Sequence, residues 1–249
     1  NAQVDRMDQN IGRVVRKLEE MGELDNTLIL FWSDNGCSAE PENNMFGYKF
    51  KQNRRDNFQE WRRDSRRSSS QGRAWANASN SPFRKYKKWT HEGGTATPLV
   101  AHWPKGIKAP DRWHREPAHV IDIMATCVEL SGADYPTGYD GHEIQPMEGS
   151  SLGPALRGGS IDRPKPIFWE HEGNWAVRDG RWKLVSDGPG GAWELYDMEA
   201  DRTETNDLSD HHPKRVDAMA KKWEQWARAR NVLPWPWKPK WGAGRTKQM

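Results

Sequence analysis

The sequence predicts an α/β domain followed by a small subdomain built on an antiparallel sheet. An amphipathic helix leads into an apolar strand within the first 33 residues, and a strong hairpin pattern appears after residue 173. Helices that alternate with buried strands are typical of α/β domains, whereas consecutive hairpins build antiparallel sheets. The 249 residues suit one large domain with a smaller partner. We therefore expect domains of residues 1–164 and 165–249.

The first helix and strand carry the clearest patterns. Seven apolar residues recur at three- and four-residue steps: Val4, Met7, Ile11, Val14, Val15, Leu18 and Met21. This spacing predicts an amphipathic helix that ends near Gly22. Residues 27–33 then form an apolar run without polar alternation, which predicts a strand covered on both faces. A helix followed by such a strand is half of a βαβ unit, so we expect a parallel sheet.

The middle of the chain has a weaker pattern. Residues 98–103 predict a second strand, and the apolar positions of 120–128 predict a helix that ends near Gly132. Pro, Gly and Asp residues cluster over 134–163, which indicates a long connection.

A basic, irregular stretch interrupts the first domain at about residues 40–81. Its arginines concentrate in segment 51–73, where they occur in pairs. A loop of this length inside a compact domain is functional or disordered. It is either a solvated, partly helical excursion or a basic lid over an anionic substrate.

The C-terminal subdomain reads as an antiparallel sheet and a final helix. Extended segments are expected at 167–170, 174–178, 181–185 and 193–197. Asp179-Gly180 can adopt the positive φ angles of a type I′ hairpin turn. Apolar residues from 216 to 227 predict the final helix, which the prolines after it end because proline cannot continue the backbone ladder.

Composition excludes several classes of protein. Lys and Arg total 38 against 35 Asp and Glu, so the net charge of +3 argues against a nucleic-acid partner bound by bulk charge. Two cysteines cannot form a disulfide scaffold. We expect no membrane span, because no apolar run approaches about 20 residues. The 15 tryptophans supply much of the core, or stack on a ligand such as a sugar.

Two short segments could carry chemistry. Asp34 and Asn35 follow the first strand and offer hard oxygen donors suited to Ca²⁺ or Mg²⁺. The alternative is an ordinary Asp-Asn-Gly turn, and two donors fall short of the six to eight that Ca²⁺ takes. The second segment joins Lys87 to Gly93-Gly94, where glycines permit close backbone approach and lysine can pair with an anion.

Taken in order, these and later segments resemble the sulfatase family, and more narrowly bacterial arylsulfatases. The matching segments are Ser33-Asp34-Asn35-Gly36, Tyr86-Lys87, His91-Glu92-Gly93-Gly94, Ala101-His102-Trp103-Pro104, Trp169-Glu170-His171-Glu172-Gly173-Asn174 and Glu194-Leu195-Tyr196-Asp197. The resemblance covers about residues 4–230. It implies an alkaline-phosphatase-like sheet-and-helix domain, incomplete here, followed by a small α+β subdomain with an antiparallel sheet and a terminal helix.

The resemblance also implies roles for single residues. Asp34 and Asn35 would be ligands of one Ca²⁺ ion, whose remaining ligands we expect upstream of Asn1. Lys87 would be the catalytic lysine that holds the sulfate ester oxygens. Lys88 is the alternate substrate-binding lysine if the register is shifted by one.

Two histidines are further candidates for substrate binding. His91 and His171 would lie near the leaving group, or each is a hydrogen-bonded structural histidine. The glycines beside His91 would shape the loop that presents the lysine.

One departure from the family pattern is important. Sulfatases use a formylglycine nucleophile made from Cys or Ser in a Cys-x-Pro-Ser-x-Arg type motif. Neither Cys37 nor Cys127 is followed by Pro-Ser-x-Arg. We therefore expect a C-terminal portion of a sulfatase, truncated at its N-terminus and inactive by itself.

The resemblance implies a sulfuric-ester hydrolase acting on aryl or carbohydrate sulfate esters. The alternatives are a phosphoester or phosphonate ester hydrolase of the same superfamily, and a non-catalytic glycan-binding module. Because many such sulfatases are exported, we expect a periplasmic or extracellular protein.

The missing nucleophile motif leads to a direct prediction. The purified 249-residue chain should release sulfate from 4-nitrophenyl sulfate no faster than buffer does, because attack on sulfur needs an activated nucleophile. Ion chromatography of released sulfate measures this. Release that grows in proportion to the concentration of the chain would contradict the prediction.

Overall fold

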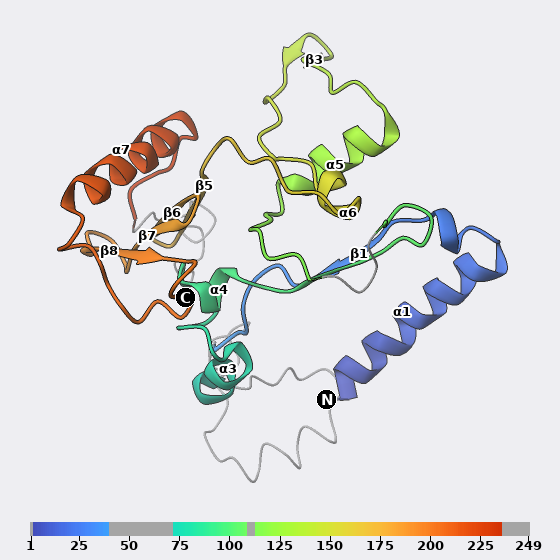
Figure 1. Ribbon diagram of the computed structural model, residues 1–249, viewed down its shortest axis with the longest axis horizontal. Coiled ribbons are helices and arrows are strands. Elements are labelled where there is room, and N and C mark those ends of the chain that lie inside the picture. The colour runs from blue at the N-terminus through green and yellow to red at the C-terminus, as the bar shows by residue number, and fades with distance from the viewer. Residues whose placement is uncertain (1, 40–71, 109–112, 236–249) are drawn as a thin grey trace, which may run out of the picture. The chain divides into compact units, whose positions relative to one another are not determined.

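The computed structural model describes residues 2–39, 72–108 and 113–235 (Figure 1). These form two compact units, each made of two stretches of sequence. The first unit is Asn1–Ser33 with Pro98–Pro164, and the second is Asp34–Thr97 with Lys165–Met249. The division into domains 1–164 and 165–249 stays a prediction. No described helix is both long enough and apolar enough to cross a membrane.

The first unit contains short strands and three α-helices in the described residues. Its elements are α1 (Ala2–Glu20), η1 (Leu24–Asn26), β1 (Ile29–Trp32), β2 (Leu99–His102), α5 (Asp122–Ser131), β3 (Gly138–Tyr139), β4 (His142–Glu143) and α6 (Gly153–Leu156). The predicted helices α1 and α5 are confirmed. Each is followed by a glycine in the left-handed region, Gly22 at φ 72° and Gly132 at φ 67°, which ends a helix without steric cost.

The direction of the β1–β2 pair corrects the sequence prediction. The strands pair antiparallel, with Ile29 opposite His102 and Trp32 opposite Leu99. They therefore do not form the parallel sheet expected from the helix–strand order. The expected burial on both faces is also wrong, because Phe31 and Trp32 are exposed. A short apolar run does not specify its partner or its direction, and the long excursion between these strands allows an antiparallel return.

Asp122 organises the chain around the long connection predicted over residues 134–163. Its buried carboxylate accepts hydrogen bonds from the backbone amides of His119 (2.7 Å) and Ser150 (2.9 Å), and it pairs with Arg163. These contacts fix the chain around α5. The connection predicted over 134–163 also contains the β3–β4 hairpin and the short helix α6.

The second unit is built on a four-stranded antiparallel sheet. Its elements are α3 (Gly72–Asn80), α4 (Glu92–Thr95), β5 (Ile167–His171), β6 (Asn174–Asp179), β7 (Trp182–Ser186), β8 (Trp193–Asp197) and α7 (Pro213–Ala229), with strand order β5-β6-β7-β8. The predicted strands and final helix are confirmed. Within the stretch expected to be irregular, α3 is helical. Residues 40–71, with most of the basic segment, lie outside the described residues.

The β6–β7 turn differs by one residue from the prediction. Asp179 pairs with Trp182, so the two turn residues are Gly180 and Arg181. Of these two, Gly180 has a positive φ, at 58°. A turn whose first central residue is a glycine with positive φ fits type II′ better than the predicted type I′.

The two faces of this sheet have different partners. One face packs against α7 through Val177, Leu184 and Leu195, which meet Met219 and Trp223 of the helix. Several aromatic rings surround this core: Phe168, Trp175, Trp182, Trp193 and Trp226. Tryptophan therefore supplies much of the core of this unit, as expected. Because side chains alternate along a strand, the opposite face presents the neighbours of the core residues.

Candidate functional site

The lysine loop, residues 84–95, is closed by hydrogen bonds within its own backbone. The amide of Gly93 donates to the Arg84 carbonyl (2.8 Å). A Cβ on Gly93 would lie 2.2 Å from that oxygen, and a Cβ on Gly94 would lie 2.0 Å from the Trp89 carbonyl oxygen. Any side chain at either position would therefore open the loop. Lys88 has a φ of 94°, so the chain also turns sharply at the lysines.

This loop binds the Asp34–Gly36 turn edge to edge. The Gly36 amide donates to the Gly94 carbonyl (2.9 Å), and the Lys87 amide donates to the Cys37 carbonyl (3.0 Å). A Cβ on Gly36 would lie 1.8 Å from the Gly93 oxygen. The structure thus brings together the two segments that the sequence singled out, although about 50 residues separate them. Asp34 is exposed, and its neighbour Asn35 is half-buried.

The tip of the β5–β6 hairpin lies against the same loop. The Lys88 ammonium forms an ion pair with Glu172 (2.6 Å), and the Thr90 hydroxyl donates to the Trp175 carbonyl (3.1 Å). His171 is the last residue of β5 and is exposed to solvent. It directly precedes Glu172 in the sequence. Lys88 and the hairpin carrying His171 therefore belong to one side of the loop, and Glu172 balances the charge of Lys88.

His91 lies in the interior instead. Its ring is fully buried, and Nε2 is 3.1 Å from Oε2 of Glu194. The hydrogen bonds from His91 and Tyr196, together with the nearby charge of Arg84, lower the pKa of Glu194 to about 2. Burial lowers the pKa of His91. Because an ionised carboxylate can only accept, Nε2 of His91 is the donor in this contact. In this arrangement the ring supports the loop, and its contact with a substrate stays a prediction.

Glu92 begins α4 and anchors the loop by its charge. Its carboxylate contacts Nζ of Lys183 (3.0 Å) and a guanidinium nitrogen of Arg202 (2.8 Å). Burial alone would raise the pKa of Glu92, but these two cations lower it to about 2. Lys183 and Glu204, which complete this cluster, were missed by the sequence reasoning. A lysine inside the apolar run of β7 was the signal that could have revealed them.

The donors available for a metal ion fit calcium in kind but not in number. Asp34 and Asn35 offer the oxygen atoms that Ca²⁺ prefers. Among the described residues, no group of three or more His, Cys, Asp or Glu side chains is arranged to hold a metal. Two donors are fewer than the six to eight that Ca²⁺ takes. Among the described residues, Asp34 and Asn35 are two candidate donors, and the calcium site stays a prediction.

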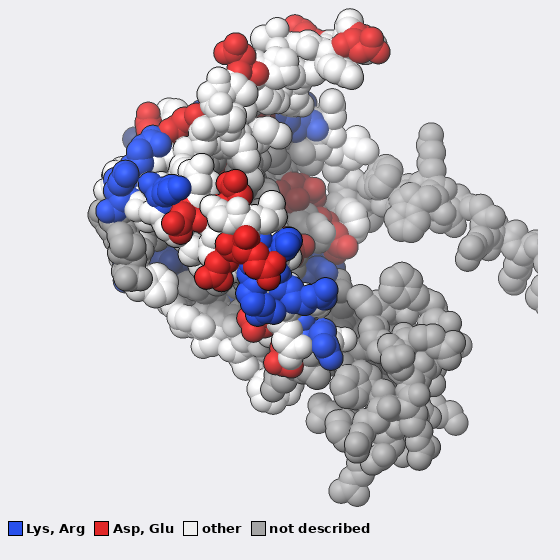
Figure 2. Space-filling view, turned by 90° about the vertical axis from the view of Figure 1, so that its right-hand side faces the viewer, with Lys and Arg blue, Asp and Glu red and all other residues white. Residues whose placement is uncertain are grey.

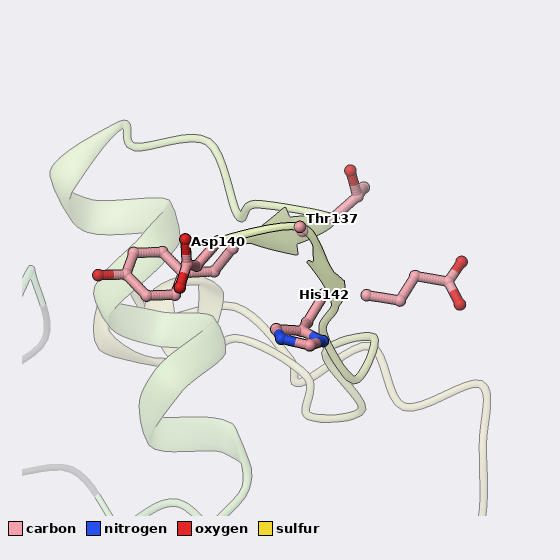
Figure 3. Close-up of a pocket in the computed structure, with 7 residues that line it drawn as sticks. Thr137, Asp140 and His142 are labelled. Atoms are coloured by element: carbon pink, nitrogen blue, oxygen red, sulfur yellow. The ribbon is translucent and has the colours of Figure 1, made fainter.

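A hollow lies in the first unit. It is formed by residues 137–143 around the β3–β4 hairpin and includes Thr137, Asp140 and His142 (Figure 3). All seven lining residues are exposed. None of the predicted site residues belongs to this hollow.

Charge is mixed on the molecular face shown in Figure 2. Lys and Arg groups adjoin Asp and Glu groups there. This agrees with the small net charge of +3. Among the described residues on this face, no single sign dominates over a large area.

Comparison with solved structures defines the class of protein. The crystal structure of Ps i-CgsB, also determined in complex with k-i-k-neocarrahexaose, is similar with a TM-score of 0.63 and 25% identity. The similarity covers 88% of this chain and 40% of that chain. A phosphonate monoester hydrolase of Agrobacterium radiobacter shares the fold at 19% identity and a TM-score of 0.56, over 92% of this chain and 40% of the other. The fold is that of the alkaline-phosphatase-like hydrolases.

Sequence comparison identifies the family within this class. A family model described as Sulfatase matches residues 1–133, and one described as N-sulphoglucosamine sulphohydrolase, C-terminal, matches residues 83–230. An uncharacterized sulfatase of Schizosaccharomyces pombe is 30% identical over 243 residues, 89% of this chain and 41% of the relative. The chain belongs to the sulfatase family. It spans about two fifths of the length of these relatives.

The close approach of the two segments leads to a prediction for Gly36→Ala. The added Cβ would meet the Gly93 oxygen, so the turn must separate from the lysine loop. We expect the free energy of unfolding to fall by about 1–3 kcal/mol, as in other overpacked sites. Urea denaturation followed by tryptophan fluorescence measures the change.

Gly12→Ala in α1 is the control, because its Cβ would contact one flexible atom, Nη1 of Arg16, at 3.4 Å. Alanine favours helix over glycine by up to about 1 kcal/mol, so this variant should not lose stability. Equal stability of the two variants would show that the contact at Gly36 is unimportant.

Proposed function

We propose that this protein takes part in the hydrolysis of sulfate esters, and that the lysine loop and the Asp34–Gly36 turn form part of the site. One observation carries the proposal: the Lys87 amide donates to the Cys37 carbonyl at 3.0 Å. This bond places a lysine beside a turn that bears a carboxylate and an amide oxygen. Membership of the sulfatase family supports the same assignment.

The chemistry of these groups suits an anionic ester. The Lys87 ammonium would hold a sulfate oxygen and stabilise the negative charge that develops as the S–O bond breaks. Asp34 and Asn35 would hold part of a Ca²⁺ ion, which would polarise the sulfate when bound. Lys88, which forms an ion pair with Glu172, is the alternate candidate if the register is shifted by one.

Carbohydrate sulfates are the substrate class that we favour over simple aryl sulfates. The model of the C-terminal region of N-sulphoglucosamine sulphohydrolase matches 83–230, and the similar protein Ps i-CgsB was crystallised with an oligosaccharide. His171 is exposed at the end of β5, on the hairpin that contacts the lysine loop. We propose that His171 contacts the sugar that carries the sulfate.

The nucleophile lies outside these 249 residues in this proposal. The chain contains no Cys-x-Pro-Ser-x-Arg motif, so it would supply the lysine and part of the metal site but not the group that attacks sulfur. The proposal includes inactivity of the isolated chain and export to the periplasm or the medium.

The catalytic role of Lys87 is tested in the natural gene product, expressed with whatever coding sequence flanks these residues. Lys87→Ala should lower kcat on 4-nitrophenyl sulfate and on a sulfated oligosaccharide by about 10²–10³-fold, as expected for loss of a group that stabilises developing charge. Steady-state kinetics measures the effect.

Lys88→Ala is the matched control, because it removes an adjacent lysine that is ion-paired with Glu172. It should lower kcat less than about tenfold. The reverse order of effects would assign the role to Lys88 instead, and no sulfate release by the unsubstituted protein would overturn the proposed function.

The metal distinguishes a sulfatase from a phosphonate ester hydrolase of the same fold. We expect the purified protein to contain one equivalent of Ca²⁺, measured by atomic emission. A chelator should remove this ion and abolish activity. Asp34→Ala should weaken Ca²⁺ binding, since a carboxylate is the strongest donor of the pair. Two equivalents of zinc or manganese, with faster cleavage of a phosphonate ester, would favour the other hydrolase.

A further inference from the structure

A cluster of buried charges lies on the face of the sheet opposite α7. Lys183 is fully buried, and its Nζ lies 3.0 Å from Oε1 of Glu92 and 2.8 Å from Oε1 of Glu204. Glu204, also fully buried, accepts a hydrogen bond from the Glu92 amide through Oε2 (2.8 Å). Its backbone φ of 56° is uncommon for a residue other than glycine. The proposed chemistry uses none of these three side chains.

A second anchor holds the other end of the lysine loop. The Arg84 guanidinium donates to the Tyr196 hydroxyl (2.7 Å), to Glu194 (3.2 Å) and to the Glu204 carbonyl (2.9 Å). Arg84 and Glu92 therefore tie both ends of the loop to strand β8 and to the segment after it, with Lys87 between them. Glu204 contributes to both anchors, through its carbonyl to one and its carboxylate to the other.

We propose that Lys183 and Glu204 are positioning residues that fix Lys87 and the Asp34–Gly36 turn relative to each other. The proposal rests on the proposed function, because it assigns these two side chains to the same sulfate site. Neither touches the reacting atoms. They act through Glu92, whose position sets that of Gly94, and the Gly94 carbonyl accepts the Gly36 amide.

The bonds of this cluster explain why it can hold one position. The Glu92 amide donates to the Glu204 carboxylate, and the Glu92 carboxylate accepts from the Lys183 ammonium, so sliding or rotation of α4 would break both contacts. A buried charge that loses its partner is strongly disfavoured. Apolar side chains of similar volume would fill the space but would allow small displacements of the loop. A displacement of about 1 Å at a catalytic group can lower a rate about 100-fold.

The test compares Lys183→Met with the double variant Lys183→Met/Glu204→Gln, which removes one charge of each sign. If the single variant fails to fold, the double variant keeps the proposal testable. Lys222→Met is the control, because it removes a lysine–carboxylate pair with Asp179 on the same sheet without touching the lysine loop. Hydrogen–deuterium exchange of the natural gene product is followed for peptides spanning 34–38 and 84–96, with a peptide of α5, residues 122–131, as the reference.

We expect the first two peptides to exchange at least tenfold faster in the double variant, with the reference peptide within twofold of the unsubstituted protein. Activity should show a kcat at least tenfold lower with KM within twofold, and Lys222→Met should change neither. Uniform acceleration of all peptides, or unchanged exchange in the lysine loop, would overturn the proposal. If the unsubstituted protein releases no sulfate, the proposed function fails, and the exchange result alone decides whether these residues fix the loop.

Discussion

The contact between three glycines is the constraint on which the candidate site depends. Gly36, Gly93 and Gly94 bring two backbone segments so close that a single Cβ on Gly36 would lie 1.8 Å from a carbonyl oxygen. At this distance the backbones themselves form the hydrogen bonds that join the turn to the lysine loop. Side chains on either segment can then project from one rigid edge. The relative position of Asp34, Asn35 and Lys87 therefore follows from the absence of side chains at neighbouring positions.

Backbone contact alone would not hold so short a loop in one place, and buried charge supplies the remaining restraint. Removing Lys183, Glu92 and Glu204 from water costs free energy that offsets much of their mutual attraction. These contacts restrain the position of the lysine loop, because each ion contact joins defined partners. The charges of Lys183 and Arg202 lower the pKa of Glu92 to about 2, so this carboxylate is ionised at neutral pH and keeps its ion contacts there.

Local patterns in the sequence predicted the helices and strands better than they predicted which segments pair with each other. The helices α1, α5 and α7 and the strands of the C-terminal sheet follow from periodicity, because amphipathic spacing reports which face is buried. The antiparallel direction of β1 and β2 has no local signature, and neither does the Lys183–Glu92 contact, which joins residues 91 positions apart. The site segments were found as motifs, and their contact was implied by resemblance. His91 shows the limit of that route, since its burial against Glu194 could not be read from its neighbours in the sequence.

The order of the candidate site depends on the C-terminal sheet, which its segments contact from distant parts of the chain. Three segments that are distant in the chain meet at the site: the turn at residues 34–37, the lysine loop and the strand bearing Lys183. Each closure of a long loop lowers the conformational entropy of the chain before stabilising contacts form. Thr90, His91 and Glu92 tie the lysine loop to the sheet by polar contacts, so the order of the loop depends on the sheet. The sheet is stabilised independently, by the tryptophan-rich core against α7. The packing of one face of the sheet on α7 thus fixes the opposite face, which carries Lys183, and that face in turn fixes the geometry of the candidate anion site.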